Sequence, residues 1–247
     1  MTLQEFFREN PLVALGFSGG ADSAYLLWEA VNNGAQVRPY YVNSQFQPEF
    51  ELRDARRLCE ELSVELAVIP LDVLGSPKVR ENPPDRCYHC KRAIFGALRE
   101  RALSEGFPVL IDGTNASDDA GDRPGMRALG ELSVRSPLRE CGISKEEVRE
   151  RSRAAGLFTW DKPAYACLAT RVPGGEPLEA GLLERIERAE DCLFSLGFTD
   201  FRVRVFGGGA RLQVPEGQLA RAVERRREIL AGLGGLFPAV MLDLRER

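Results

Sequence analysis

Apolar, β-branched runs alternate with amphipathic stretches along the first 140 residues of the chain. The runs at 12–17, 37–43, 67–71 and 109–111 have the length and composition of buried strands, and the stretches at 22–32, 49–62 and 91–104 have the period of helices. Strands that alternate with helices need crossover connections, which produce a mostly parallel sheet with helices on both faces. We therefore predict an α/β fold for this part of the chain.

The pattern changes after residue 175. A helical stretch at 178–196 is followed by the strands FRVRVF and ARLQV on either side of a glycine turn, then by a helix at 217–231 and the strand AVMLDL. This αββαβ order predicts a small α+β domain over 176–247 beside a larger domain over 1–175. Two segments without periodicity, 75–90 and 116–139, are predicted to be long loops with a functional role.

Composition and charge restrict the class of protein. The 247 residues carry a net charge of −4, so no global field attracts nucleic acid or an anionic membrane. The start of the chain lacks a signal-peptide pattern, and no apolar run reaches the roughly 18 residues of a membrane span. We expect a cytoplasmic homo-oligomer without nucleic-acid or membrane partners, whose six cysteines serve metal binding, catalysis or packing rather than disulfides.

The first predicted strand runs into a glycine turn, SGGADS, at the start of the first predicted helix. Gly19 and Gly20 let the backbone approach an anion, and the helix points free N–H groups and its positive end at the same place. Ser18 and Ser23 add hydroxyl donors, while Asp22 indicates either a helix cap or a Mg²⁺ ligand. The turn lacks the lysine of a Walker loop, and a plain strand-to-helix turn is the alternative.

Further polar residues follow the second and fourth predicted strands. Ser44 comes directly after the second, and Thr114 and Asn115 lie in DGTNASDD, residues 112–119. Ligands of open parallel sheets bind beyond the carboxyl ends of the strands, so these residues are predicted to complete one site with the glycine turn. For Thr114 and Asn115 the alternative is an Asx-type turn that ends the strand.

SGGADS resembles the signature of the PP-loop ATP pyrophosphatases, which have the adenine nucleotide α hydrolase-like fold and cleave ATP between its α and β phosphates. A longer set of motifs is similar to the LarE family of sulfur transferases: RCYHCK (86–91), DGTNASDDAGDRPGMRA (112–128), SPL (136–138), DKPAYACLATRVPGG (161–175) and FRVRVF (201–206). This resemblance implies that the chain uses ATP and Mg²⁺ to adenylate the carboxylates of pyridinium-3,5-biscarboxylic acid mononucleotide and convert them to thiocarboxylates in nickel-pincer nucleotide cofactor synthesis. Adenylation gives a carboxylate a good leaving group.

The resemblance gives Cys87, Cys90 and Cys167 two possible roles. In the version we favour, the three thiolates hold a [4Fe–4S] cluster whose fourth iron has no protein ligand and carries the sulfur. In the other version, Cys167 gives up its own sulfur and becomes dehydroalanine. The residues alone also leave open a zinc site, a redox dithiol or inert thiols. In a zinc site, His89 lies between the two cysteines, where ligation together with both would be cramped. The other cysteines, at 59, 141 and 192, are predicted to pack in the core.

Two arginines alternate with apolar residues in FRVRVF. Arg202 and Arg204 project from one face of the predicted strand, and two guanidinium groups at this spacing suit a phosphate. The resemblance implies that they bind the phosphate of the mononucleotide, and a solvated strand face is the alternative. Arg171 is a further candidate for contact with the nucleotide. Three residues of the 116–139 segment either shape the choice of substrate or order their loop: Asp122, Arg123 and Arg127.

Three other functions compete with this assignment. A tRNA-thiolating PP-loop enzyme can also use three cysteines and a cluster, but the isoelectric point of about 5.4 and the lack of an RNA-binding module disfavour it. An amide-forming synthetase leaves the three cysteines without a role. A non-catalytic nucleotide sensor needs the glycine turn but not the cysteines. The donor that supplies the sulfur is unassigned under every alternative.

Overall fold

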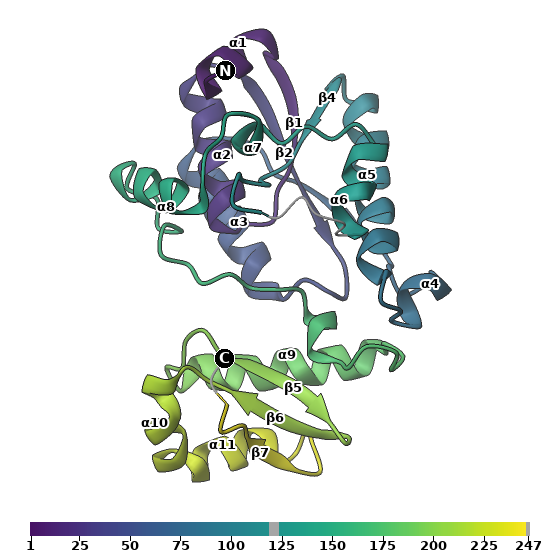
Figure 1. The fold of residues 1–247 in the computed structure, drawn as a ribbon, viewed down its shortest axis with the longest axis vertical. Helices are drawn as coiled ribbons and strands as arrows, with labels where there is room; N and C mark the ends of the chain where they lie inside the picture. The colour runs from purple at the N-terminus through teal and green to yellow at the C-terminus, as the bar shows by residue number, and fades with distance from the viewer. Residues whose placement is uncertain (119–123, 246–247) are drawn as a thin grey trace. The chain divides into compact units, whose positions relative to one another are not determined.

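The computed structural model describes residues 1–118 and 124–245 (Figure 1). The chain forms two compact units. The first contains residues 1–73 and 85–162, and the second contains residues 74–84 and 163–247. The boundary between two separately folding domains, predicted at residue 175, stays a prediction.

A four-stranded parallel sheet forms the centre of the first unit. Its order is β3-β2-β1-β4, with β1 at Leu12–Gly16, β2 at Gln36–Asn43, β3 at Ala67–Pro70 and β4 at Val109–Ile111. Every one of these strands lies within one residue of its predicted bounds. The predicted α/β fold with a parallel sheet is confirmed.

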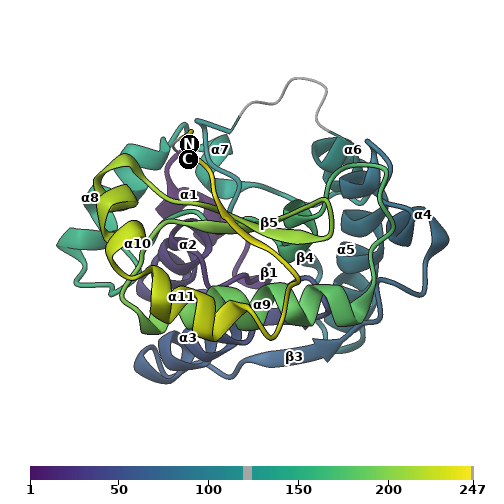
Figure 2. The ribbon, with the colours of Figure 1, turned by 90° about the horizontal axis from the view of Figure 1, so that it is seen from below.

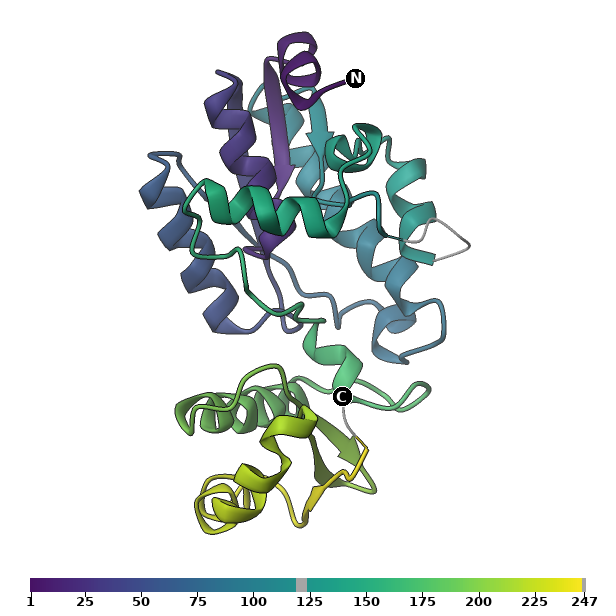
Figure 3. The same cartoon turned by 60° about the vertical axis from the view of Figure 1, so that its left-hand side comes forward.

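Helices cover both faces of this sheet (Figures 1 and 3). On one face Val13, Leu15 and Tyr41 pack in a core with side chains of α1 (Leu3–Glu9), α2 (Ala21–Asn32), α3 (Glu49–Glu61) and α8 (Lys145–Ala154). On the other face Ala14 and Tyr40 pack against α5 (Arg86–Ser104) and α6 (Pro124–Glu131). Because side chains alternate across a strand, neighbouring residues of β1 serve opposite cores.

The two segments predicted to be loops contain helices. Residues 75–90 include α4 (Pro77–Arg80) and the first turn of α5, and residues 116–139 include α6 and α7 (Pro137–Glu140). Proline stands at the start of α4, α6 and α7, where its fixed φ favours a helix and its missing N–H costs nothing. The loop prediction was therefore wrong because these prolines start helices rather than break them. Helix α1 was not predicted.

The second unit has a three-stranded mixed sheet covered by helices. Strands β5 (Arg202–Phe206) and β6 (Gly209–Gln213) are antiparallel, and β7 (Val240–Leu242) runs parallel to β6. Gly207 and Gly208, both with positive φ, form the predicted hairpin turn. Helix α9 (Ala180–Ser195) packs beside α11 (Arg226–Leu233), as Figure 2 shows.

The αββαβ order is confirmed, with one change of detail. The helix predicted at 217–231 is divided into η2 (Glu216–Gln218), α10 (Leu219–Glu224) and α11. A short 3₁₀ helix, η1 (Leu168–Arg171), precedes α9. No helix within residues 1–118 or 124–245 combines the length and apolar character that a membrane span requires.

Candidate active site

The glycine turn lies between the end of β1 and the start of α2. Gly19 has a φ of 71°, and a Cβ added to it would stand 2.9 Å from the backbone oxygen of Glu51 on α3. Gly20 is the N-cap of α2, and no side chain caps the helix. The turn therefore needs glycine at position 19, and the first-turn amides of α2 are the donors that a bound phosphate would meet.

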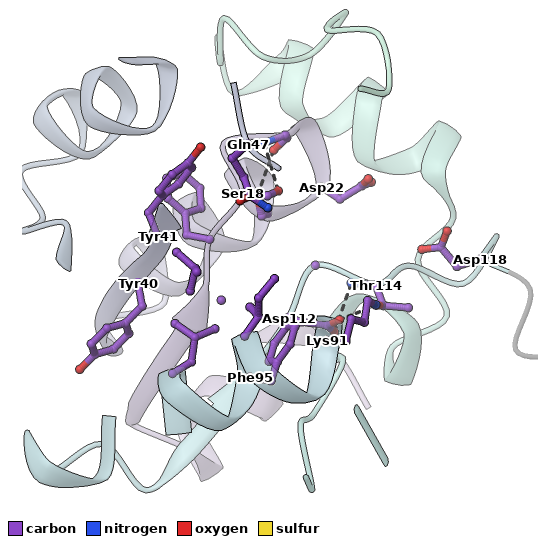
Figure 4. A pocket seen from close by; sticks show the side chains of 18 residues that line it. Ser18, Asp22, Tyr40, Tyr41, Gln47, Lys91, Phe95, Asp112, Thr114 and Asp118 are labelled. Carbon is purple, nitrogen blue, oxygen red and sulfur yellow. Dashed lines mark hydrogen bonds between the residues drawn. The ribbon is translucent and has the colours of Figure 1, made fainter. Parts of the chain in front are cut away.

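A cavity of about 350 Å³ opens over this turn at the carboxyl ends of the strands (Figure 4). Figure 4 shows Tyr40 and Tyr41 on its left and Asp22, Thr114 and Asp118 on its right. An apolar wall beside a polar end is an arrangement that suits a nucleotide. The lining residues are Gly16, Phe17, Ser18, Gly20, Asp22, Ser23, Tyr40, Tyr41, Val42, Gln47, Lys91, Ile94, Phe95, Leu98, Asp112, Gly113, Thr114 and Asp118.

The structure brings most of the predicted ATP-binding residues to this cavity. Five of them line it: Ser18, Gly20, Asp22, Ser23 and Thr114. The Oγ atoms of Ser18 and Ser23 are 3.1 Å apart, so the two hydroxyls face each other across the turn. The roles of these residues in binding ATP stay predictions.

Three other predicted ATP-binding residues contact the site without lining the cavity. Gly19 shapes the turn, as its φ and its contact with α3 require. Ser44 donates a hydrogen bond of 2.6 Å to Oε1 of Gln47, which lines the cavity. Asn115 is buried and donates from Nδ2 to Oδ1 of Asp22 over 3.1 Å. All three therefore orient lining groups.

Two carboxylates and an asparagine form an acidic corner of the cavity. Asn115 binds Asp22 through its side chain, and its backbone N–H donates to Oδ2 of Asp118 over 3.0 Å. Burial raises the pKa of Asp22 above the ordinary aspartate value, and the hydrogen bond from Asn115 opposes this shift. Within the described residues no three His, Cys, Asp or Glu side chains gather as a metal site. Mg²⁺ commonly uses one or two carboxylates together with substrate phosphates, which Asp22 and Asp118 fit.

The raised pKa of Asp22 gives a prediction with a defined sign. An acid whose pKa is raised on folding destabilises the folded state when it is ionised, so its contribution to stability is lost as the pH rises above about 4 through the folded pKa. Asp22→Asn keeps an oxygen that accepts from Asn115 but removes the buried charge. At pH 7 and without nucleotide, we expect urea unfolding to give an unchanged or higher free energy of unfolding.

The predicted role of Asp22 as a Mg²⁺ ligand implies that the same variant loses ATP cleavage by about 100-fold. Glu61→Gln is the control, since Glu61 is exposed in the same unit and pairs with Arg57. A fully active variant would contradict the predicted Mg²⁺ role of Asp22, and a markedly less stable variant would contradict the expected cost of its buried charge.

The sequence did not single out Lys162, which contacts the glycine turn from the end of the first unit. Its Nζ donates to the backbone oxygen of Gly19 over 3.1 Å and to Oδ2 of Asp54 over 2.6 Å. Asp112 was also missed as a site residue. It is buried and accepts hydrogen bonds of 2.6 Å from Thr114 Oγ1 and Ser136 Oγ. Its position directly after β4 was the signal that could have found it.

The cysteine pair lies in the first turn of α5 and not in a loop as predicted. Cys87 and Cys90 are three residues apart on this helix and therefore share a face. Cys87 is exposed and Cys90 half-buried, and none of the six cysteines, all of which lie in the described residues, forms a disulfide. His89, which lies between them, has Nε2 at 3.2 Å from the carboxylate of Asp85.

Cys167 belongs to the second unit, where it is the N-cap of η1 and half-buried. Because Cys87 and Cys90 belong to the first unit, the three-cysteine site stays a prediction. The core position predicted for Cys59 is confirmed, and burial raises its pKa to about 12. Burial also raises the pKa of Cys141 and Cys192, which are half-buried.

The predicted phosphate-binding arginines are not on a solvated strand face. Arg202 is 4% exposed and donates to the backbone oxygen of Ala164, while Arg204 donates to the backbone oxygen of Thr170. Arg171 is 1% exposed and forms an ion pair with Glu190. Burial and the neighbouring Arg171 lower the pKa of Arg202 to about 10. Phosphate binding by Arg202 and Arg204, and contact of Arg171 with the nucleotide, stay predictions.

Of the residues predicted to shape substrate choice, Arg127 lies on α6 with its guanidinium 4.1 Å from the ring centre of Tyr88. Asp122 and Arg123 lie outside the described residues.

Comparisons with known proteins give relatives that match most of this chain. No family model matches the sequence. An uncharacterized protein of Synechocystis is 36% identical over 225 residues, which are 90% of this chain and 83% of the relative. The pyridinium-3,5-bisthiocarboxylic acid mononucleotide synthase of Lactiplantibacillus plantarum is 32% identical over 248 residues, covering 98% of this chain and 89% of the relative. A tRNA-specific 2-thiouridylase of Thermotoga petrophila is 25% identical over 193 residues, covering 61% of this chain and 54% of the relative.

Proposed function

Since this chain belongs to the LarE family, that of the pyridinium-3,5-bisthiocarboxylic acid mononucleotide synthase, we propose that it is an ATP-dependent sulfurtransferase of nickel-pincer cofactor synthesis. It has the PP-loop fold, with a glycine turn at the carboxyl end of the first strand. Its substrate is the pyridinium-3,5-biscarboxylic acid mononucleotide, whose two carboxylates become thiocarboxylates. The relationship to the synthase over 98% of this chain is the observation that carries the proposal.

The first step of the proposed reaction is adenylation. A substrate carboxylate oxygen attacks the α-phosphorus of ATP, the bond to the bridging oxygen breaks, and pyrophosphate leaves. The hydroxyls of Ser18 and Ser23 and the first-turn amides of α2 would stabilise the charge that grows on the leaving group. Asp22 and Asp118 would hold Mg²⁺, which supplies further positive charge to the phosphates. The aromatic wall of the cavity would cover the adenine.

The second step replaces AMP by sulfur. A sulfur nucleophile attacks the carbonyl carbon of the acyl-adenylate, and the bond to the AMP oxygen breaks, which leaves a thiocarboxylate and free AMP. We propose that Cys87, Cys90 and Cys167 hold a [4Fe–4S] cluster, which would carry the sulfur so that the thiols survive each turnover. The alternative is that Cys167 gives its own sulfur. Arg202 and Arg204 would bind the phosphate of the mononucleotide.

We also propose where the chain works and in what assembly. Six cysteines without a disulfide fit the reducing cytoplasm, and we propose that the chain works there as a homo-oligomer. The second candidate function is tRNA thiolation, because tRNA-specific 2-thiouridylases are also relatives, over 61% of this chain.

One experiment separates the two candidates. The anaerobically purified protein is incubated with ATP, Mg²⁺ and sulfide, and with either the mononucleotide or unmodified tRNA, and the products are analysed by mass spectrometry. We expect the mononucleotide to exchange one and then two oxygens for sulfur while AMP accumulates, and tRNA to stay unchanged. Sulfur in tRNA, with an unchanged mononucleotide, would reject the proposal in favour of tRNA thiolation.

A further inference from the structure

Arginine side chains hold the backbone on both sides of Cys167. We call residues 164–170 the Cys167 segment. Arg202 Nη2 donates to the oxygen of Ala164 over 2.5 Å, and Arg204 Nη1 donates to the oxygen of Thr170 over 2.7 Å. Between them, Arg171 Nη1 donates to the oxygen of Ala166 over 2.7 Å and lies 3.5 Å from that of Cys167. Three guanidinium groups thus bind carbonyls from the start to the end of this segment.

The carbonyl of Cys167 itself is held from several directions. It accepts from the backbone N–H of Thr170 over 2.9 Å and from Thr170 Oγ1 over 2.8 Å. Arg171 Nη1 completes this arrangement by lying 2.9 Å from the same hydroxyl. The backbone dihedral angles on either side of the Cys167 thiol are therefore determined by Thr170 and Arg171.

Glu190 on α9 connects this arrangement to the rest of the second unit. Its carboxylate is 1% exposed and receives Nε and Nη2 of Arg171 over 2.8 and 3.0 Å. It also accepts from the hydroxyl of Tyr165, within the Cys167 segment, and from the backbone N–H of Val203 on β5 over 2.9 Å. One carboxylate therefore ties the segment to α9 and β5.

Stability alone does not explain a buried ion pair of this kind. Desolvation of two charges offsets much of their attraction, so apolar residues of similar size would serve the fold as well. Two of the Arg171 nitrogens neutralise Glu190, but the third binds the Cys167 segment. The planar guanidinium of Arg171 therefore binds the carboxylate of Glu190 and carbonyls of the Cys167 segment at the same time. A lysine, with a single nitrogen, could not hold both groups in this geometry.

We propose that Arg171 and Glu190 are positioning residues for sulfur transfer. They hold the backbone of Cys167 so that the transferred sulfur, carried by a cluster that Cys167 ligates or donated by its thiol, meets the activated carbonyl before water does. The inference rests on the proposed function, because it assumes that sulfur transfer needs Cys167. It gives Arg171 a role different from nucleotide contact. A misplaced sulfur would leave the acyl-adenylate to hydrolysis, which regenerates the carboxylate and releases AMP.

The test compares Arg171→Lys with Arg225→Lys. Lysine at position 171 keeps a positive charge beside Glu190 but loses the bonds to the Cys167 segment. Arg225 is the matched control, because it also joins a carboxylate, Glu228, to a backbone oxygen, that of Leu196, but does so away from the segment. Thr170→Val is a second variant without any change of charge, and it serves if Arg171→Lys does not fold.

The readout is the amount of AMP formed per thiocarboxylate, with ATP, Mg²⁺, sulfide and the mononucleotide. We expect this ratio to rise well above one in Arg171→Lys and Thr170→Val, with thiocarboxylate formation about tenfold slower and an unchanged KM for the mononucleotide. A smaller folded fraction would lower both products equally and leave the ratio at one. Chelator-treated protein is also reacted with iodoacetamide. The rate at which Cys167 is alkylated, divided by the rate for Cys141, should differ from that of the unchanged protein in these two variants but not in Arg225→Lys.

An unchanged ratio and alkylation rate in the folded variants would overturn the inference. A raised KM at an unchanged ratio would also overturn it, because Arg171 would then contact the nucleotide. If Cys167→Ala still transfers sulfur, the fault lies instead with the proposed role of that thiol.

Discussion

Replacing Gly19 by alanine is expected to slow ATP cleavage by about 100-fold or more while the fold is kept. Gly19 has a φ of 71°, which alanine adopts at a cost of roughly 1–2 kcal/mol. The new Cβ would also stand 2.9 Å from the backbone oxygen of Glu51, so the turn or α3 must move. Either movement displaces Ser18 and the first-turn amides of α2 from the phosphates. Pyrophosphate release measures the loss.

Gly34→Ala separates the backbone effect from the effect on the site. Gly34 has a φ of 74°, but a Cβ there would meet no atom within 4 Å. This variant should therefore show a similar drop in the urea unfolding midpoint with ATP cleavage close to that of the unchanged protein. If the two variants lose activity to the same degree, the close packing at Gly19 is not what the reaction needs.

Replacing Cys167 by alanine is expected to reduce thiocarboxylate formation to background. Both versions of the sulfur chemistry need this thiol, either as a cluster ligand or as the sulfur donor. The residues proposed for adenylation lie in the first unit, so AMP and pyrophosphate should still form when the mononucleotide is present. Thiocarboxylate and AMP are measured in the same reaction by mass spectrometry.

Cys87→Ala then distinguishes the two versions. Loss of sulfur transfer together with loss of the brown colour of the anaerobic protein would support the cluster, whereas single-turnover transfer without colour would support donation by Cys167. Cys141→Ala is the control, because this half-buried thiol belongs to neither version, and it should transfer sulfur normally. Normal transfer by Cys167→Ala would contradict both.

The elements that the sequence predicted well are those determined by local pattern. Strands β1, β2 and β4 contribute side chains to the cores on both faces of the sheet, so their apolar runs are continuous and their bounds could be predicted within a residue. The prolines at 77, 124 and 137 lie in the two segments predicted to be loops, although each stands at the start of a helix. The helix predicted at 91–104 begins five residues earlier, so that it includes the cysteine pair.

Part of the candidate site could be predicted because its residues follow strand ends. Ser18, Asp22 and Thr114 line one cavity for this reason. Lys162 could not be predicted, because its contact with Gly19 joins residues 143 positions apart. The spacing of Arg202 and Arg204 predicted a shared face but could not show that backbone carbonyls of the Cys167 segment lie against it.

The proposed acyl-adenylate is tested most directly by following the carboxylate oxygens of the substrate. The mononucleotide is labelled with oxygen-18 in both carboxyl groups, and AMP is isolated after reaction with ATP, Mg²⁺ and sulfide. The account predicts one labelled oxygen in the phosphate of AMP for each thiocarboxylate formed, because that oxygen bridges the two groups before sulfur displaces it. Unlabelled AMP, or ADP and phosphate as the products, would contradict it.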